Sequence, residues 1–194
     1  MIKKKIIFFS TPFDIESINF LEKLKVKLYK VASFDVSNYQ LLKRIISTKK
    51  PTIVSTGMAS LNEIKKTYKM FKTNKVDLAL LHCISSYPNK EEASYLSNIE
   101  YLKSKFDCTI GFSDHTNDIN TSIYSFLLGA KIIEKHFVIS KSMNCIDKPV
   151  SIDSFQFKEM KREIDRLIRI LGKTKFGVRP EEKSTKIFKR KKIL

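Results

Sequence analysis

Two of the chain's three histidines follow short apolar runs in the same way. His115 comes shortly after the run 108–110, and His136 comes shortly after the run 131–133. Each run is short enough to be a strand, so parallel pairing of the two would place both imidazoles at one edge of a sheet. A single histidine at a strand end is more often an ordinary polar residue. Two at matched positions favour a divalent-metal site with open positions, because neutral imidazoles are good metal ligands.

Small hydroxyl side chains follow other apolar runs and form a second chemical pattern. Ser33, Ser55, Ser85 and Ser113 stand at such positions, with Lys30 among them. Hydroxyls, backbone amides and one ammonium can together hold a phosphate. Serine is common in loops, so each one alone carries little weight. Beside a metal site, the set predicts a phosphorylated substrate and a carbonyl group that the metal polarises.

Six apolar runs, separated by helical patterns, must position these residues. The predicted strands are 6–9, 28–31, 52–54, 77–81, 108–110 and 131–133. Repeated βα spacing without apolar–polar alternation is typical of a parallel sheet, either doubly wound or closed into a barrel. The chain has no G-x-G-x-x-G motif and no P-loop, which weakens the nucleotide-binding, doubly wound alternative.

A TIM-type (β/α)8 barrel explains in addition why polar side chains gather after the strands, where active sites of this fold lie. These side chains are Thr11, Lys30, Ser33, Asp35, Ser55, His82, Ser85, Tyr87, Ser113, His115 and His136. A complete barrel has eight units and the chain supplies about six of them. We therefore expect an incomplete α/β barrel.

The last part of the chain divides into a helix and a polar tail. Asp153 is the predicted cap of a long helix, which Gly172 ends. Its apolar stripe, expected to face inward, is Phe157, Met160, Ile164, Leu167, Ile168 and Leu171. We expect a partial barrel domain over residues 1–172 and a linker over residues 173–194.

Composition and charge bound the class of protein. The chain has 194 residues, 42% of them hydrophobic, enough for one domain or a piece of one. No apolar run approaches the ~20 residues of a membrane span, and the N-terminal run is too short for a signal peptide. Three cysteines without C-x-x-C spacing fit reduced thiols. We therefore expect a cytoplasmic protein.

The net charge of +17 raises the alternative of nucleic-acid binding. Lysines are scattered along the predicted helices, with one cluster in 186–192, and no zinc-finger spacing or RNA-binding aromatic signature accompanies them. A lysine-rich solvated surface is therefore favoured over a nucleic-acid interface. Steeply salt-dependent binding to DNA or RNA would support the alternative.

Six motifs together resemble the sialic acid synthase family (N-acetylneuraminate, legionaminate and pseudaminate synthases). They are Phe9-Ser10-Thr11-Pro12-Phe13, Tyr29-Lys30-Val31-Ala32-Ser33, Ile53-Val54-Ser55-Thr56-Gly57-Met58, Leu81-His82-Cys83 with Tyr87-Pro88, Gly111-Phe112-Ser113-Asp114-His115-Thr116, and Leu128-Gly129-Ala130 with Glu134-Lys135-His136-Phe137. They occur in the family's order and cover nearly the whole chain. Several stretches, Phe176-Gly177-Val178-Arg179-Pro180 among them, look most like the pseudaminate branch.

The resemblance implies an activity and its cofactors. Members of the family condense phosphoenolpyruvate with an N-acylated six-carbon amino sugar and water, giving a nine-carbon 2-keto acid and phosphate. His115 and His136 match the ligands of a divalent metal, Mn²⁺ or Mg²⁺, that polarises the sugar aldehyde. The residues that match phosphoenolpyruvate contacts are Thr11, Lys30, Ser33, Ser55, Ser85 and Ser113, with Ser85 standing where some relatives have Asn.

Further matches concern the sugar and the metal surroundings. Tyr87 matches a residue that lies against the sugar, and Asp147 matches a carboxylate that binds its hydroxyls. Asp35 replaces an acidic residue that is often Glu, so its side chain is shorter. Glu134 is expected either to orient the metal ligands or to form a salt bridge with Lys135 or another basic residue.

The chain also departs from the family pattern. Relatives begin with two further βα units and continue into a small antifreeze-like domain that caps the partner's site in a homodimer. Two hypotheses follow. The chain is a metal-dependent synthase, working alone or with a complementing N-terminal fragment, or it is an inactive remnant or partner-binding fragment of one. The open edges of an incomplete barrel favour aggregation or pairing with such a fragment.

Overall fold

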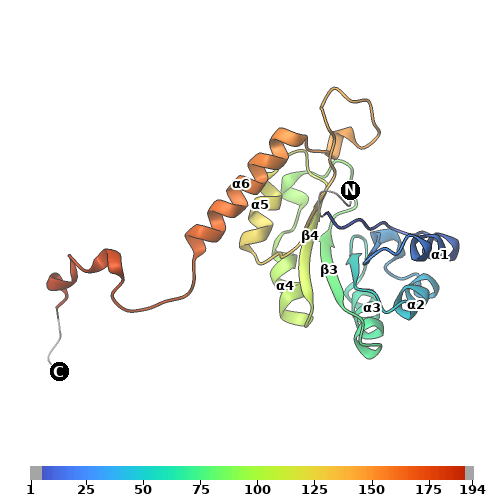
Figure 1. Cartoon of the computed structure of the whole chain (residues 1–194), viewed down its shortest axis with the longest axis horizontal. Coiled ribbons are helices and arrows are strands. Elements are labelled where there is room, and N and C mark those ends of the chain that lie inside the picture. Colours follow the sequence, from blue (N-terminus) through green and yellow to red (C-terminus); the bar gives the residue numbers. More distant parts are fainter. Residues whose placement is uncertain (1–5, 191–194) are drawn as a thin grey trace.

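The structure is a computed structural model and describes residues 6–190. Its centre is a five-stranded sheet in the order β1-β2-β3-β4-β5, in which every pairing is parallel (Figure 1). The strands are β1 (Tyr29–Val31), β2 (Thr52–Ser55), β3 (Leu78–Cys83), β4 (Thr109–Asp114) and β5 (Ile133–Lys135). The sheet curls as part of a barrel would, which confirms the predicted incomplete α/β barrel.

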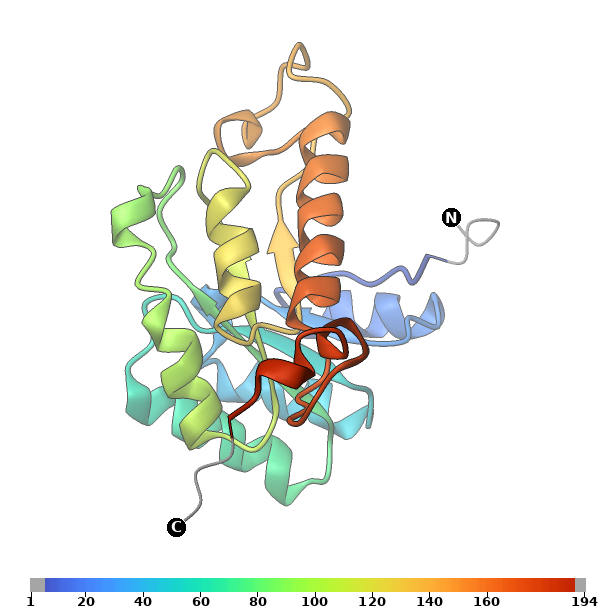
Figure 2. The ribbon, with the colours of Figure 1, turned by 90° about the vertical axis from the view of Figure 1, so that its left-hand side faces the viewer.

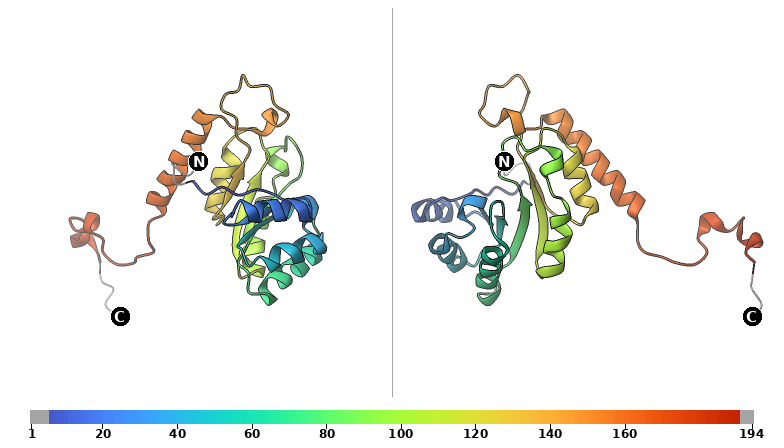
Figure 3. Two further views of the ribbon diagram at one scale, coloured as in Figure 1. Left: turned by 45° about the vertical axis from the view of Figure 1, so that its right-hand side comes forward. Right: turned by 180° about the vertical axis from the view of Figure 1, so that it is seen from behind.

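Helices connect the strands and lie around the outside of the sheet (Figure 3). They are α1 (Ile15–Lys23), α2 (Tyr39–Ser47), α3 (Leu61–Thr73), α4 (Ser97–Lys105), α5 (Asn120–Leu127) and α6 (Ser154–Leu171). A capping box starts α3: Ser60 accepts a bond from the Glu63 amide, and the Glu63 carboxylate accepts one from the Ser60 amide. Sequence pattern and structure agree on each of these helices.

The main core fills the space between the sheet and helices α1 to α4. Leu42 and Ile45 of α2 and Phe71 of α3 are completely buried there, as are Leu80 of β3 and Phe112 of β4 to within 1%. A parallel sheet needs apolar cover on this outer face. The side chains on its other face are consequently free to be polar where the strands end.

The predicted strand 6–9 does not form. This segment is extended chain without a ladder, and its side chains are exposed, from 63% at Ile6 to 36% at Phe9. The Lys30 amide donates to the Ser10 carbonyl at 3.2 Å, so the segment meets the edge of the sheet just after the apolar run. A buried parallel strand needs neighbours on both sides. Within residues 6–190, β1 is the one strand that bonds to this stretch of chain, which explains why the prediction of a sixth strand is wrong.

The predicted inward stripe of α6 is correct for only half of its residues. Met160 is buried with Ile119 and Ile152, and Ile164 packs against them, but Leu171 is 59% exposed. The N-terminal part of α6 lies alongside α5 (Figure 2), whereas its C-terminal part projects from the molecule (Figure 1). The stripe correctly indicated an amphipathic helix. Half of the stripe, Phe157, Ile168 and Leu171, is exposed within residues 6–190.

The tail after Gly172 contains two short 3₁₀ turns, Pro180–Glu182 and Lys186–Phe188, and its described side chains are exposed. Its role as a linker stays a prediction, and residues 191–194 lie outside the described part, including two lysines of the predicted basic cluster. No helix in residues 6–190 has the length and apolar character to cross a membrane.

Candidate functional site

A cavity of ≈ 360 Å³ opens where the strands end. Five residues predicted to contact a phosphorylated substrate line it together. They are Thr11, Lys30, Ser33, Ser55 and Ser113. They come from the ends of β1, β2 and β4 and from the extended segment before α1, so the parallel topology brings together residues that are distant in sequence. Active sites of barrel folds lie at this end of the strands.

Lys30 is a cation of this cavity, and three contacts set the position of its ammonium, one of them a hydrogen bond of 3.1 Å to the Val31 carbonyl. Its ammonium donates to the Ser55 hydroxyl at 2.8 Å and lies 3.4 Å from the Glu134 carboxylate. The other oxygen of Glu134 accepts from the Ser113 hydroxyl at 2.7 Å. Glu134 therefore pairs with Lys30 rather than with Lys135. The buried ammonium has a counter-charge, as a buried charge requires.

Gly57 allows the serines to approach one another. Its amide donates to the Ser33 hydroxyl at 3.0 Å, and a Cβ at this position would overlap the hydroxyl oxygens of Ser33 and Ser85. Ser85 lies behind the cavity wall, with its hydroxyl 4.0 Å from the Cys83 thiol. A residue without a side chain is what this contact needs.

The two predicted metal ligands come together at the same cavity. The ring centroids of His115 and His136 are 5.4 Å apart, and Tyr87 packs against both rings, 4.0 Å from His115 and 5.8 Å from His136. Nδ1 of His115 lies 2.7 Å from the Ile84 carbonyl oxygen. Because a carbonyl only accepts, Nδ1 carries the proton and Nε2 keeps its lone pair. Metal-bound histidines typically donate their other ring N–H in this way.

His136 has a carboxylate partner, since its Nδ1 lies 3.3 Å from Asp147. Asp147 does not line the cavity itself but reaches it through this histidine. The donor set fits a divalent ion that takes two imidazoles and fills its other positions with substrate or water. Among the described residues, no group of three or more His, Cys, Asp or Glu side chains forms a complete metal cage.

The pKa values of the two imidazoles are shifted in opposite directions. Burial lowers the pKa of His115, but hydrogen bonds with Cys83 and with the Ile84 carbonyl outweigh this effect, so its pKa is raised. Burial lowers the pKa of His136 by more than Asp147 raises it. His136 therefore stays neutral to a lower pH than His115 does.

Cys83 lines the cavity and was not among the predicted site residues. Its thiol lies 3.9 Å from Nδ1 of His115. Burial raises the pKa of Cys83, but contacts with His115, Ser33 and Ser113 together lower it by more. Side-chain alternation along β3 could have indicated this residue, because Leu81 and Cys83 share one face of the strand.

His82 and Asp35 were expected at the rim and lie elsewhere. His82 points to the opposite face of β3, where its Nε2 is hydrogen bonded to the Ser94 carbonyl at 2.7 Å. Alternation along the strand gives the physical reason, since its neighbour Cys83 takes the cavity side. Asp35 belongs to the 3₁₀ turn Ser33–Asp35 and accepts a bond from Asn38 at 2.9 Å, outside the cavity lining.

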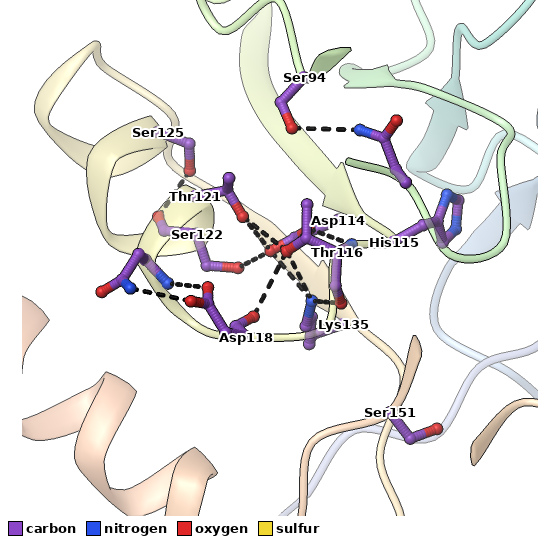
Figure 4. A network of polar contacts seen from close by, with 12 residues as sticks. Ser94, Asp114, His115, Thr116, Asp118, Thr121, Ser122, Ser125, Lys135 and Ser151 are labelled. Carbon is purple, nitrogen blue, oxygen red and sulfur yellow. Dashed lines mark hydrogen bonds and ion pairs between the residues drawn. The ribbon is translucent and has the colours of Figure 1, made fainter. Parts of the chain in front are cut away.

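A buried ion pair lies directly behind the histidines and was also missed. Asp114 and Lys135 are 3.2 Å apart, each adjacent in sequence to one histidine, and both side chains are almost completely buried (Figure 4). Hydroxyl groups of Thr116, Thr121 and Ser122 surround the carboxylate. Lys135 is one of the basic partners predicted for Glu134, and the strand register pairs it with Asp114 instead.

A curled parallel sheet of βα units with a polar cavity at its strand ends defines the class, a (β/α)-barrel enzyme fold of which part is present. The chain belongs to the NeuB family, the sialic acid synthases, whose family model matches residues 1–176. This confirms the resemblance that the motifs indicated.

Individual relatives support this membership. The chain is 40% identical over 190 residues to an uncharacterised protein of Methanocaldococcus jannaschii, covering 97% of this chain and 56% of the relative. It is 37% identical to the pseudaminic acid synthase of Campylobacter jejuni, covering 95% and 54%. A crystal structure of the N-acetylneuraminic acid (sialic acid) synthetase of Leptospira borgpetersenii, in complex with citrate, superposes with a TM-score of 0.91 at 36% identity, covering 96% and 65%. The chain spans about half the length of the curated relatives that it matches.

Proposed function

We propose that this chain carries the metal- and phosphoenolpyruvate-binding part of a nonulosonic acid synthase. The reaction condenses phosphoenolpyruvate with an N-acylated six-carbon amino sugar and water, giving a nine-carbon 2-keto acid and phosphate. One observation carries the proposal: two imidazoles and a hydroxyl–ammonium cluster share one cavity at the strand ends. Family membership supports this choice of chemistry.

Phosphoenolpyruvate would bind at the hydroxyl–ammonium cluster. Lys30 supplies the ammonium, the hydroxyls of Ser33, Ser55 and Ser113 supply donors, and Thr11 adds a contact at the open side. Lys30 is already held by Ser55 and Glu134, so little side-chain entropy is lost when the substrate binds. Glu134 offsets part of this positive charge, so the hydroxyls and the chain's net charge of +17 carry more of the attraction for the anion.

His115 and His136 would hold Mn²⁺ or Mg²⁺. When bound, this ion supplies a Lewis acid that polarises the sugar aldehyde toward attack by the enol carbon of phosphoenolpyruvate. His115 presents Nε2 because its Nδ1 proton is held by the Ile84 carbonyl. Asp147 fixes the ring of His136 through Nδ1.

The sugar would lie on the outer side of the histidines. Tyr87 is half exposed and packs on His115, which leaves ring surface available to the apolar face of a sugar. Asp147 is exposed and offers its second oxygen to sugar hydroxyls. Asp35 and Ser85 lie outside the cavity lining, so their predicted contacts with substrate stay predictions.

Activity would require polypeptide beyond the residues described here. Exposed apolar side chains lie at both ends of the sheet, on the segment 6–9 and on α6. If the segment 6–9 also paired as a strand, two further βα units would bring the five strands of the sheet to eight, the number that closes a barrel of this kind. The proposed partner is therefore a complementing N-terminal fragment, and a homodimer would form on that completed barrel. Without such a partner, the chain would be an inactive fragment that keeps its ligand site.

Metal binding tests the site before any turnover is required. Titration of the 194-residue chain with Mn²⁺, followed by electron paramagnetic resonance, is expected to reveal one site that His115→Ala removes. His82→Asn is the matched control, because His82 is the third histidine and lies outside the cavity. Tight binding that is unchanged in His115→Ala would contradict the assigned site.

Turnover tests the reaction. The chain is mixed with phosphoenolpyruvate, Mn²⁺ and a panel of N-acylated hexosamines, with and without a polypeptide containing the two N-terminal βα units of a relative. Phosphate release and a nine-carbon keto acid are expected only in the complemented mixture. Equal turnover by the chain alone would contradict the need for a partner, and Mn²⁺ binding without any turnover in either mixture would contradict the synthase activity.

A further inference from the structure

Cross-strand contacts between β4 and β5 alternate between the two faces of the sheet. Ser113 lies opposite Glu134 and Asp114 lies opposite Lys135 in the strand register. The first pair lines the cavity, with a hydrogen bond of 2.7 Å. The second pair is joined to α5 through Thr121 and Ser122 (Figure 4), and Lys135 also borders the cavity. Because side chains alternate along a strand, the next positions, His115 and His136, face the cavity again. Asp114 and Lys135 thus form the pair of strand positions immediately before the two imidazoles.

Asp114 holds the turn that carries His115. Its Oδ1 accepts from the Thr116 amide and from the Thr116 hydroxyl, both at 2.8 Å (Figure 4). A bond from an aspartate to the amide two residues later fixes the backbone of the residue between them. Its Oδ2 accepts from Thr121 at 2.9 Å and from Ser122 at 2.6 Å, which ties the same carboxylate to the first turn of α5.

Lys135 holds the same turn from the neighbouring strand. Its ammonium donates to the Thr116 carbonyl at 2.6 Å and lies 3.2 Å from Asp114. The next residue along β5 is His136. A single side chain therefore connects the backbone just after one imidazole to the strand that carries the other.

We propose that the Asp114–Lys135 pair is a positioning device that sets the placement of His115 relative to His136. The proposal rests on the proposed function in one respect, that the two imidazoles share a ligand. Asp114 and Lys135 are positioning residues, since neither is needed to touch the metal. Buried ion pairs contribute little net stability compared with apolar residues of similar volume, so a role in fixing register accounts for this pair better than stability does.

Lys135→Met is the decisive variant because an electrostatic role and a positioning role predict opposite changes in Mn²⁺ affinity. Removal of a cation beside a metal site, with Asp114 left as an anion, would tighten Mn²⁺ binding if charge alone mattered. If Lys135 positions the histidines, Mn²⁺ binding weakens instead, by about 10- to 100-fold as for other residues that orient metal ligands. The measurement is a Mn²⁺ titration at a temperature where circular dichroism shows that the variant is folded.

The double variant Asp114→Asn/Lys135→Met keeps the test decisive if the single variant unfolds. It leaves no unpaired buried charge, so it should fold better than either single variant. Weak Mn²⁺ binding is still expected, because the Thr116 carbonyl has lost its donor. Lys50→Met is the control, since it breaks another partly buried pair, with Glu22, at the opposite end of β2. Its Mn²⁺ affinity should equal that of the original chain.

A metal-free readout separates this proposal from the proposed function. Ring ¹⁵N chemical shifts are expected to report the Nδ1-protonated tautomer of His115 in the original chain and its loss in Lys135→Met. Unchanged shifts together with unchanged or tighter Mn²⁺ binding in Lys135→Met would overturn the positioning role. Absence of Mn²⁺ binding by the original chain, with the tautomer still dependent on Lys135, would contradict the metal site and support the positioning role.

Discussion

The centre of the sheet and its two ends differ in how completely they are covered. Leu80 of β3 and Phe112 of β4 are enclosed by helices, and the paired register across β2, β3 and β4 is continuous. At one end, Ile7 is 60% exposed, and at the other end, Ile170 of α6 is 66% exposed. Apolar content is high in all three places. What differs is whether another part of residues 6–190 lies against them.

This difference indicates that the candidate site depends on the well-packed part. Except for Thr11, which belongs to the extended segment before α1, its ammonium and hydroxyl groups lie on or just after strands of the paired sheet, while the exposed surfaces lie on either side. A ligand site can therefore persist in a chain whose sheet ends are open. Four perturbations test this contrast between centre and ends.

The largest effect is expected from a cavity at the centre. Phe112→Ala removes a fully buried aromatic ring and should lower the free energy of unfolding by ~3–5 kcal/mol. Phe20→Ala, on α1 where the ring is exposed, is the matched change and should stay within ~0.5 kcal/mol. Urea denaturation of both variants measures the contrast. Equal losses would mean that the sheet centre is not the cooperative core.

Glycine substitutions should give the next largest effect. A Cβ at Gly111 of β4 would overlap the Ile132 carbonyl oxygen, which is backbone and cannot move aside, so Gly111→Ala should cost about 1–3 kcal/mol. Gly57→Ala would overlap hydroxyls of Ser33 and Ser85, which can rotate away. It should cost less stability while narrowing the cavity. Thermal melts of the two variants provide the comparison, and a larger loss for Gly57→Ala would contradict it.

Two helix caps test the same contrast between the centre of the sheet and its ends. Removal of an N-cap typically costs about 1 kcal/mol. Ser60→Ala removes the capping box of α3, which packs on the core, and should lower global stability. Asp153→Ala removes the corresponding cap of α6, much of which projects. Hydrogen exchange should then detect local loss of protection in α6 and little global change. A global loss from Asp153→Ala would show that α6 is part of the cooperative unit.

The smallest effect concerns acid stability at α3. Hydrogen bonds from the hydroxyls of Ser37 and Ser60 lower the pKa of Glu63 from 4.5 to about 2. A carboxylate with a lowered pKa in the folded state stabilises the protein fully above its unfolded pKa and loses this contribution as pH falls toward 2. Ser37→Ala should therefore reduce the acid dependence of unfolding below pH 4.5. An unchanged acid titration would indicate that this contact is not maintained in solution.

Local patterns in the sequence predicted where helices begin and end, but they predicted less well which segments are buried. The cap at Asp153 and the stop at Gly172 are local signals, and they mark the two ends of α6 in the structure. The run 6–9 and the stripe of α6 are equally clear apolar signals. Apolar character says that a segment can be buried, whereas burial also needs a neighbour, which no local pattern supplies.

The candidate site shows the same limit at the level of single residues. The shared position of the histidines at a strand edge followed from parallel pairing, and the two rings do meet. The partner of Glu134 could not be read, because it depends on how β1 and β5 approach each other across the cavity. Asp114 and Lys135 could have been paired from the matched spacing, since each precedes one of the two histidines. Alternation along β3 likewise separates Cys83 from His82.

The strand order has a consequence for how the chain folds as it is synthesised. Each strand pairs with the strand that precedes it in the chain, so no pairing waits for a distant segment to be synthesised. Contacts between sequence neighbours keep the contact order low for a parallel sheet and favour stepwise growth during translation. A further unit can join at either end without breaking any existing pair. The sheet can therefore grow by one βα unit at a time, and its ligand site can form before the barrel closes.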